Sequence, residues 1–176
     1  NIAVLSDGLG SGVKANVLST MTASMAMNFR VRHEPILRTI KAIMDTLPVD
    51  SVRNISYSTF TIIDVDSDGE AKIVEFDNPP LLLVRDNKVT RIKTDDTIIK
   101  RKAEGDRQDE RLIKMSNITL KKEDRLICFS DGVSQSGIGN RDMPFGWEDG
   151  IDEFIEELVK KKPKISTIDE WFKEYS

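Results

Sequence analysis

The feature that most constrains the fold is a run of strand-like segments that no helix interrupts. Residues 57–65 are rich in β-branched and aromatic side chains, and residues 71–76 alternate between apolar and polar ones. Residues 81–84 and 89–92 follow, with Asp86-Asn87 between them as a hairpin signal. Strands joined by such short turns pair as antiparallel neighbours. The middle of the chain is therefore predicted to be an antiparallel sheet.

Helical patterns precede and follow these strands. Residues 13–30 contain no Pro or Gly and are rich in Ala, Met and Leu. Residues 36–47 carry apolar side chains at helical spacing behind Pro35, and residues 148–162 form an amphipathic pattern. Each of these segments is predicted to be a helix. Residues 94–110 are highly charged, and we expect them to form a loop.

Three further segments complete the predicted order of elements. Residues 2–6, 112–118 and 125–130 are apolar and strand-like. Two helices thus come early, antiparallel strands follow and more helix comes last. This order indicates an α+β fold and not alternating βαβ units. No linker-like composition interrupts the chain, so residues 1–176 are expected to form a single domain.

Composition and charge argue against several classes of function. The chain has 176 residues, of which 30 are acidic and 26 basic, and its net charge of −4 argues against a nucleic-acid-binding surface. No apolar stretch approaches the roughly 18 residues that a membrane span needs. The single cysteine, Cys128, excludes an intramolecular disulfide. These features favour the cytoplasm. Because the chain opens directly on a strand-like segment, we expect its N-terminal edge to be truncated.

One short motif occurs twice. Val4-Leu5-Ser6-Asp7-Gly8 and Cys128-Phe129-Ser130-Asp131-Gly132 each place an aspartate and a glycine behind an apolar segment. A carboxylate at a strand end is held on a rigid element, and the glycine lets the backbone approach a ligand closely. If the two strands are neighbours, Asp7 and Asp131 bring hard oxygen ligands together, which suits Mg²⁺ or Mn²⁺. Asp-Gly is also a common turn dipeptide, so a purely structural role stays open.

The glycine cluster behind Asp7 does not form a nucleotide-binding motif. A dinucleotide fingerprint needs a third glycine where Val13 stands, and a P-loop needs a glycine directly before Lys14. A glycine-rich loop that opens a helix still presents free N–H groups to an anion. Gly10 and Lys14 are therefore candidates for contact with a phosphate or a substrate, although a solvated lysine on a helix is the commoner situation.

These motifs resemble those of a known family. Asp7-Gly8-Leu9-Gly10-Ser11-Gly12, followed by Lys14-Ala15, is similar to the Asp-Gly-Met-Gly-x-Gly-x-x-Ala signature of the SpoIIE-type bacterial metal-dependent (PPM) serine/threonine protein phosphatases. Phe129-Ser130-Asp131-Gly132-Val133 is similar to their later Ser-Asp-Gly motif. Ser58-Thr59-Phe60 and Phe76-Asp77-Asn78-Pro79-Pro80-Leu81 match the order of the family's middle part. The resemblance covers nearly the whole chain.

The resemblance implies a fold and a mechanism. The fold is a four-layer α-β-β-α sandwich with two mainly antiparallel sheets and a metal site between them. Asp7 would bridge two Mn²⁺ or Mg²⁺ ions, the Gly8 carbonyl would bind one of them, and Asp131 would hold the other. A metal-bridging hydroxide would hydrolyse phosphoserine or phosphothreonine on a bacterial signalling protein. The implied partner is a phosphorylated anti-sigma-factor antagonist of the STAS type.

The chain departs from the family's pattern towards its C-terminus. The family has a further aspartate in an Asp-Asp-x-Thr stretch before a last strand, and nothing after Gly132 matches it. Asp95-Asp96-Thr97 is similar to this stretch, but it lies before the later Ser-Asp-Gly motif and not after it. The remaining aspartates lie in loop or helical contexts: Asp142, Asp149, Asp152 and Asp169. We expect a domain truncated at this end as well. The alternative is a catalytically inactive phosphatase-like module that binds a partner.

Three other features have a structural interpretation. Residues 64–75 satisfy the calcium-loop pattern of an EF-hand, but strand-like segments flank them where an EF-hand needs helices, so a β-hairpin turn is preferred. His33, the only histidine, is expected at a polar helix end. Trp147 is expected to pack, with contact to a protein substrate as the alternative. Met21, Met25 and Met27, in the helix predicted over residues 13–30, are expected to pack in the core.

Overall fold

Two structural units alternate along the chain. In the computed structural model, residues 1–78 and 93–120 form the first unit, and residues 79–92 and 121–176 form the second. The structure describes residues 1–10, 12–47, 49–50, 55–56, 58–102, 108–139 and 150–161. The expectation that the whole chain is a single domain stays a prediction.

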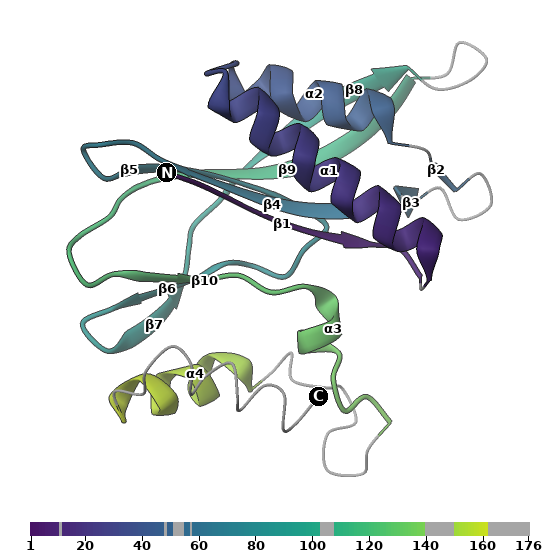
Figure 1. Ribbon diagram of the computed structural model, residues 1–176. Coiled ribbons are helices and arrows are strands. Elements are labelled where there is room, and N and C mark those ends of the chain that lie inside the picture. Colours follow the sequence, from purple (N-terminus) through teal and green to yellow (C-terminus); the bar gives the residue numbers. More distant parts are fainter. Residues whose placement is uncertain are drawn as a thin grey trace. The chain divides into compact units, whose positions relative to one another are not determined.

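A five-stranded antiparallel sheet forms the centre of the first unit (Figure 1). Its strands follow the order β1 (Ile2–Gly8), β4 (Ser58–Val65), β5 (Glu70–Phe76), β9 (Gln108–Thr119) and β8 (Asp95–Lys102). The first strand pairs with β4 along its whole length, with Ile2 opposite Asp64 and Gly8 opposite Ser58. The N-terminal strand is therefore fixed by a strand that lies far from it in sequence.

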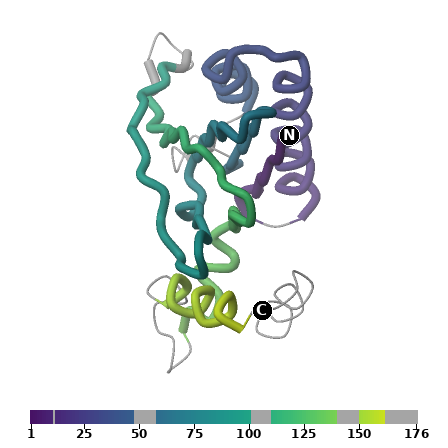
Figure 2. Tube along the Cα trace, turned by 90° about the vertical axis from the view of Figure 1, so that its left-hand side faces the viewer, coloured from purple at the N-terminus to yellow at the C-terminus, as the bar shows by residue number. Residues whose placement is uncertain are grey.

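Two helices, α1 (Val13–Val31) and α2 (Ile36–Thr46), cover one face of this sheet, as Figures 1 and 2 show. A short hairpin of β2 (Val49–Asp50) and β3 (Ile55–Ser56) follows α2. The rings of Phe60 and Phe76, on neighbouring strands, have centroids 5.4 Å apart. They belong to a buried core that also contains Ala26, Ile40, Ile43, Met44, Leu47, Ile62, Val74 and Ile113.

The buried side of α1 is lined by small side chains, namely Ala15, Thr22 and Ala26. Met25 packs against the core, whereas Met21 and Met27 are 45% and 37% exposed. The prediction that all three methionines pack in the core is therefore wrong for two of them. At 3.6 residues per turn, positions 21 and 27 lie about a third of a turn away from the line of small residues.

A three-stranded antiparallel sheet forms the second unit. Its order is β10 (Arg125–Ile127), β6 (Leu82–Arg85) and β7 (Lys88–Arg91). Asp86 and Asn87 connect β6 to β7 with φ values of 53° and 60°. Two consecutive residues with positive φ are what a two-residue hairpin turn requires, and Asp and Asn tolerate this conformation better than most residues. The predicted hairpin is confirmed.

Two helices belong to the second unit, α3 (Asp131–Ser134) and α4 (Ile151–Lys160). α4 packs Ile151, Ile155 and Val159 against Leu82 and Val84 of β6. These three residues recur every four positions, so they form one apolar stripe along the helix. The amphipathic pattern in the sequence had predicted this helix correctly.

Two ion pairs tie elements of the second unit together. Arg85 on β6 donates two hydrogen bonds, from Nε and Nη2, to the carboxylate of Asp124, with the Nη2–Oδ2 distance at 2.6 Å. The Asp124 side chain is only 3% exposed. Arg91 on β7 pairs with Asp152 on α4 at 2.8 Å, where both side chains are more exposed.

Two segments differ from the predicted secondary structure. Residues 94–110, expected to be a loop, contribute β8 and the first part of β9. β8 is an edge strand, and exposed edge strands tolerate charged side chains that hide the apolar alternation. The strand expected over residues 125–130 ends at Ile127. Asp131 therefore does not follow a strand directly but opens α3.

The predicted fold class is confirmed. The described residues form an α+β fold in which helices pack against the five-stranded and against the three-stranded antiparallel sheet. Within the described part of the chain, no helix combines the length and apolar character needed to cross a membrane.

Candidate metal site

Asp7 is the second-last residue of β1, and it lies opposite Thr59 on β4. Its side chain is half-buried, and its Oδ1 accepts a hydrogen bond from the N–H of Gly8 at 2.8 Å. The prediction that Asp7 ends a strand is confirmed. Since the strand is paired on β4, the Asp7 carboxylate is held by a rigid sheet and not by a loop.

Serine hydroxyls fix the backbone around Asp7. The fully buried Ser58 donates to the carbonyl oxygen of Asp7 at 2.9 Å, and its Oγ lies 2.8 Å from that of Ser6. Ser6 in turn donates to the carbonyl oxygen of Thr59 at 2.9 Å. These side chains bridge β1 and β4 in addition to the ladder hydrogen bonds. They restrain the strand end that carries Asp7.

Gly8 has no space for a side chain. A Cβ atom built on it would lie 2.2 Å from the carbonyl oxygen of Ala15, in the first turn of α1. Ala15 itself is buried. The helix backbone therefore sits directly on the glycine that follows the aspartate. This contact explains physically why a glycine stands at position 8.

The loop from β1 to α1 turns through glycines with positive φ. Gly10 has φ of 83° and Gly12 has φ of 89°, and added side chains would meet nothing within 4 Å at either position. The glycines are thus needed for their backbone conformation and not for close packing. Lys14 is exposed in the first turn of α1, directly behind this loop. Contact of Gly10 and Lys14 with phosphate stays a prediction.

Asp131 is the first residue of α3, preceded by Ser130 as the N-cap. Its side chain is exposed, and its carbonyl oxygen accepts from the N–H of Gln135 at 2.7 Å. A Cβ atom on Gly132 would meet only the Ser130 hydroxyl, at 3.7 Å, which is ordinary contact. The two Ser-Asp-Gly copies therefore differ locally, because one ends a paired strand and the other begins a short helix.

The donor atoms available fit a hard divalent cation. Asp7 and Asp131 offer carboxylate oxygens and Gly8 a carbonyl oxygen, the ligands that Mg²⁺ and Mn²⁺ prefer. Asp7 lies in the first unit and Asp131 in the second. Within the residues that the structure describes, no group of three or more His, Cys, Asp or Glu side chains could hold a metal ion.

The Stage II sporulation protein E (SpoIIE) family matches residues 2–165, which is most of the chain. The chain belongs to the SpoIIE family. No curated protein matches its sequence.

Solved structures of SpoIIE-type phosphatase domains share the fold. The phosphatase domain of the cell fate determinant SpoIIE from Bacillus subtilis, in a crystal form without domain swapping, has a TM-score of 0.60 at 20% identity, over 98% of this chain and 69% of that one. The PP2C phosphatase domain of SpoIIE from Bacillus subtilis with a fragment of its regulatory domain has a TM-score of 0.62 at 22% identity. This match covers 90% of this chain and 42% of that one. The RsbU and RsbW domains of a Mycobacterium tuberculosis protein have a TM-score of 0.56 at 16% identity. This match covers 77% of this chain and 36% of that one. The chain therefore has the PP2C phosphatase fold, and it spans less than half of the last two chains.

The third aspartate that the SpoIIE-type pattern leads us to expect is not found among the described residues. Asp95 and Asp96 begin the edge strand β8, and Asp152 pairs with Arg91. The other aspartates named from the sequence, Asp142, Asp149 and Asp169, lie outside the described residues, as does Trp147.

The calcium-loop pattern is a β-hairpin turn, as preferred from the sequence. The segment joins β4 to β5, so strands and not helices flank it. Asp64 is engaged by Arg30, whose Nε lies 3.0 Å from Oδ2. Asp66 uses Oδ1 to accept from the N–H groups of Asp68 and Glu70, both at 2.9 Å. These bonds stabilise a tight turn.

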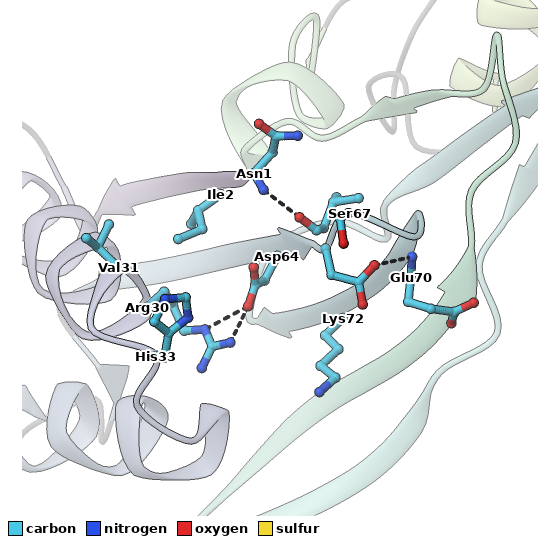
Figure 3. A pocket seen from close by; sticks show the side chains of 11 residues that line it. Asn1, Ile2, Arg30, Val31, His33, Asp64, Ser67, Glu70 and Lys72 are labelled. Carbon is cyan, nitrogen blue, oxygen red and sulfur yellow. Dashed lines mark hydrogen bonds and ion pairs between the residues drawn. The ribbon is translucent and has the colours of Figure 1, made fainter.

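A pocket of about 550 Å³ lies at the start of β1 (Figure 3). Arg30, His33, Asp64 and Lys72 are among its lining residues, and the Arg30–Asp64 ion pair forms part of its wall. His33 follows α1 with φ of 57°, so it lies at a helix end as predicted. Asp7 stands five residues beyond Ile2 on the same strand, roughly 17 Å away. The pocket is thus separate from the candidate metal site.

Asp77, at the end of β5, lies in the segment that resembles the family's middle motif. Burial raises the pKa of the Asp77 carboxyl, and the positive charges of Arg111 and Lys114 partly oppose this effect. Its neighbour Asn78 bonds to two threonines of β4, one of which is opposite Asp7. Sequence reasoning assigned no role to Thr59 or Asn78. Both residues stand in the segments that resemble the family's middle part, Ser58-Thr59-Phe60 and Phe76-Asp77-Asn78, but that resemblance did not relate them to Asp7.

Proposed function

We propose that the chain is a metal-dependent protein phosphatase that hydrolyses phosphoserine or phosphothreonine on a bacterial signalling protein. Membership of the SpoIIE family and the PP2C phosphatase fold support this proposal. The observation that carries it is Asp7, a carboxylate on a rigid strand end, followed by a glycine onto which the next helix packs directly.

In this proposal Asp7, the Gly8 carbonyl and Asp131 would hold the divalent ions, Mn²⁺ or Mg²⁺, with Asp7 as the ligand that both ions would share. Bound divalent ions lower the pKa of a water molecule and neutralise charge that develops on a phosphoryl group. The chain supplies orientation. Gly10 and Lys14, at the entry to α1, would offer an N–H group and a positive charge to the phosphate oxygens.

The proposed substrate is a phosphorylated protein, with an anti-sigma-factor antagonist of the STAS type as the specific candidate. One structural relative contains RsbU and RsbW domains in a single protein, and it supports a place in bacterial signalling. The small acidic excess of the chain gives no support to a nucleic-acid partner.

The test is hydrolysis of p-nitrophenyl phosphate and of a phosphoserine peptide by the full-length protein in Mn²⁺. Asp7→Asn and Asp131→Asn are each expected to lower kcat by at least about a hundredfold, because a metal ligand is lost. Asp96→Asn is the matched control, since Asp96 belongs to the Asp-Asp-Thr imitation on the exposed edge strand, and it should keep full activity. Activity that survives Asp7→Asn would contradict the proposal.

A catalytically inactive phosphatase-like binding module is the second candidate. The observation that favours it is the small number of candidate metal ligands. Within the described part of the chain, Asp7 and Asp131 do not belong to any group of three or more His, Cys, Asp or Glu side chains that could hold a metal ion. Tight Mn²⁺ binding without turnover by the full-length protein would support this candidate over the first.

A further inference from the structure

Thr59, Thr61 and Asn78 form a polar cluster on the face of the five-stranded sheet opposite to the helices, and Thr59 is its member next to Asp7. Phe60 and Ile62 of β4 point into the helix-covered core, so Thr59 and Thr61 point to the other face. Thr59 is directly opposite Asp7 in the antiparallel pair of β1 and β4. Directly opposite side chains have Cβ atoms about 5 Å apart. Thr59 is therefore an immediate neighbour of the proposed metal ligand.

The amide of Asn78 links the two threonines. The distance from Thr59 Oγ1 to Asn78 Oδ1 is 2.5 Å, and Asn78 Nδ2 donates to Thr61 Oγ1 at 2.9 Å. An amide oxygen carries no hydrogen, so Thr59 is the donor in the first bond. Thr61 is 1% exposed, which places this end of the cluster away from water. All three polar groups are thus held in one arrangement.

The backbone before Asn78 directs it to this place. β5 ends at Phe76, and Asp77 has φ of 52°, a left-handed conformation that breaks the strand. Asn78 is then the last residue of the first unit before Pro79-Pro80. The turn at Asp77 brings the Asn78 amide over β4 instead of continuing along β5.

This arrangement has a consequence for Asp7. A threonine hydroxyl has a single hydrogen, and that of Thr59 is used by Asn78. Thr59 can then present only lone pairs towards Asp7, and it does not donate to the carboxylate. Among the described residues, the hydrogen bond found at the Asp7 carboxylate is the one from Gly8 to Oδ1. As far as the described part of the chain is concerned, the remaining lone pairs of the carboxylate are left for a cation.

We propose that Asn78 is a positioning residue of the metal site. Its Oδ1 accepts the hydrogen bond that the Thr59 hydroxyl donates. Thr59 therefore does not donate to Asp7 in competition with a divalent cation. This inference rests on the proposed function, in which Asp7 is a metal ligand. Residues that orient metal ligands in this way commonly affect metal affinity by about 10- to 100-fold.

The experiment measures the Mn²⁺ affinity of the full-length protein, by calorimetry and by the EPR signal of free Mn²⁺. Asn78→Leu, which keeps the side-chain size, releases the Thr59 hydroxyl and should weaken Mn²⁺ binding about tenfold. Thr59→Val should change the affinity little. Thr59→Val combined with Asn78→Leu should bind like Thr59→Val alone, because the competing hydroxyl is gone. A role in packing alone would not produce this rescue.

Two further variants keep the result interpretable. Asn78→Asp retains an acceptor for Thr59 and should bind Mn²⁺ at least as tightly as the wild type. Asn117→Ala, at an exposed asparagine of β9, is the matched control and should leave binding unchanged. Circular dichroism establishes that each variant is folded, and Asn78→Asp carries the test if Asn78→Leu does not fold.

Two outcomes overturn the inference: wild-type Mn²⁺ affinity in Asn78→Leu, or a double variant that binds no better than Asn78→Leu. Weakened binding in Asn78→Asp would overturn it as well. Asp7→Asn, measured in parallel, separates this inference from the proposed function. If Asp7→Asn binds Mn²⁺ like the wild type, the proposed function fails; if only the Asn78 results disagree, the proposed function stands and the role of Asn78 is wrong.

Discussion

At the scale of single residues, the glycines that follow Asp7 and Asp131 differ in the space around them. Gly8 lies against the backbone of Ala15, where a Cβ atom would be 2.2 Å from an oxygen. Gly132 opens α3 with ordinary space around it. The same dipeptide therefore has a packing role at one site, whereas at the other the glycine could be replaced. The sequence motif does not reveal this difference.

Gly8→Ala is predicted to destabilise the protein, whereas Gly132→Ala is predicted to be tolerated. The added methyl at position 8 has to push the first turn of α1 away from β1, and overpacking against backbone costs about 3 kcal/mol. Gly132→Ala is the matched control, with an expected change below about 1 kcal/mol, because Ala suits a helix better than Gly does. Urea unfolding followed by circular dichroism measures both, and equal stabilities would show that the close contact at Gly8 does not exist in solution.

The residues of the candidate site could be predicted from the sequence only in part. Asp7, Gly8 and Asp131 stand in a repeated motif, and its residue types and spacing single them out as candidate metal ligands. Thr59 and Asn78 do not, because their relation to Asp7 arises from strand register and from one turn at Asp77. Neither of these is encoded in a local pattern.

At the scale of elements, the sequence predicted the strands and helices where periodicity was clear. α1, α4 and the hairpin of β6 and β7 were found close to their observed bounds. β8 and the start of β9 were missed, since an exposed edge strand carries charges where a buried strand carries apolar residues. The strand-like pattern before Asp131 was too long, because β10 pairs with β6 over three residues only.

The turn between β9 and β10 is predicted to give the second unit a pH-dependent stability. Arg85 lowers the pKa of the Asp124 carboxyl by hydrogen bonding, and the N–H of Lys121 adds to this effect at 2.7 Å. A lowered pKa in the folded state means that ionised Asp124 stabilises the fold above the unfolded value of about 3.9. That stability is lost as the pH falls through the lower pKa that Asp124 has in the folded protein.

Asp124→Asn is therefore expected to lower the melting temperature by about 5 °C at pH 7. The difference from the wild type should shrink below about pH 4, where the unfolded-state carboxyl begins to take up its proton. Asp152→Asn, in the more exposed pair with Arg91, is the control and should have little effect at either pH. A difference between Asp124→Asn and the wild type that stays constant down to the lowest pH would contradict the role of this carboxylate.

At the scale of the whole molecule, the order of elements was sufficient to predict an α+β fold with antiparallel sheets, and the structure and its relatives confirm it. The motifs around Asp7 and Asp131 pointed to the SpoIIE family, to which the chain belongs. A metal site that uses both Asp7 and Asp131 stays a proposal, because the two carboxylates belong to different structural units.

The most direct test of the account is a double-mutant cycle on Mn²⁺ affinity in the full-length protein. Asp7→Asn and Asp131→Asn should each weaken Mn²⁺ binding at least about tenfold, to an affinity that calorimetry still measures. If both carboxylates act on one site, as proposed, the loss in the double variant should be smaller than the sum of the two single losses. Wild-type affinity in Asp131→Asn, or losses that add independently, would contradict a metal site shared by Asp7 and Asp131.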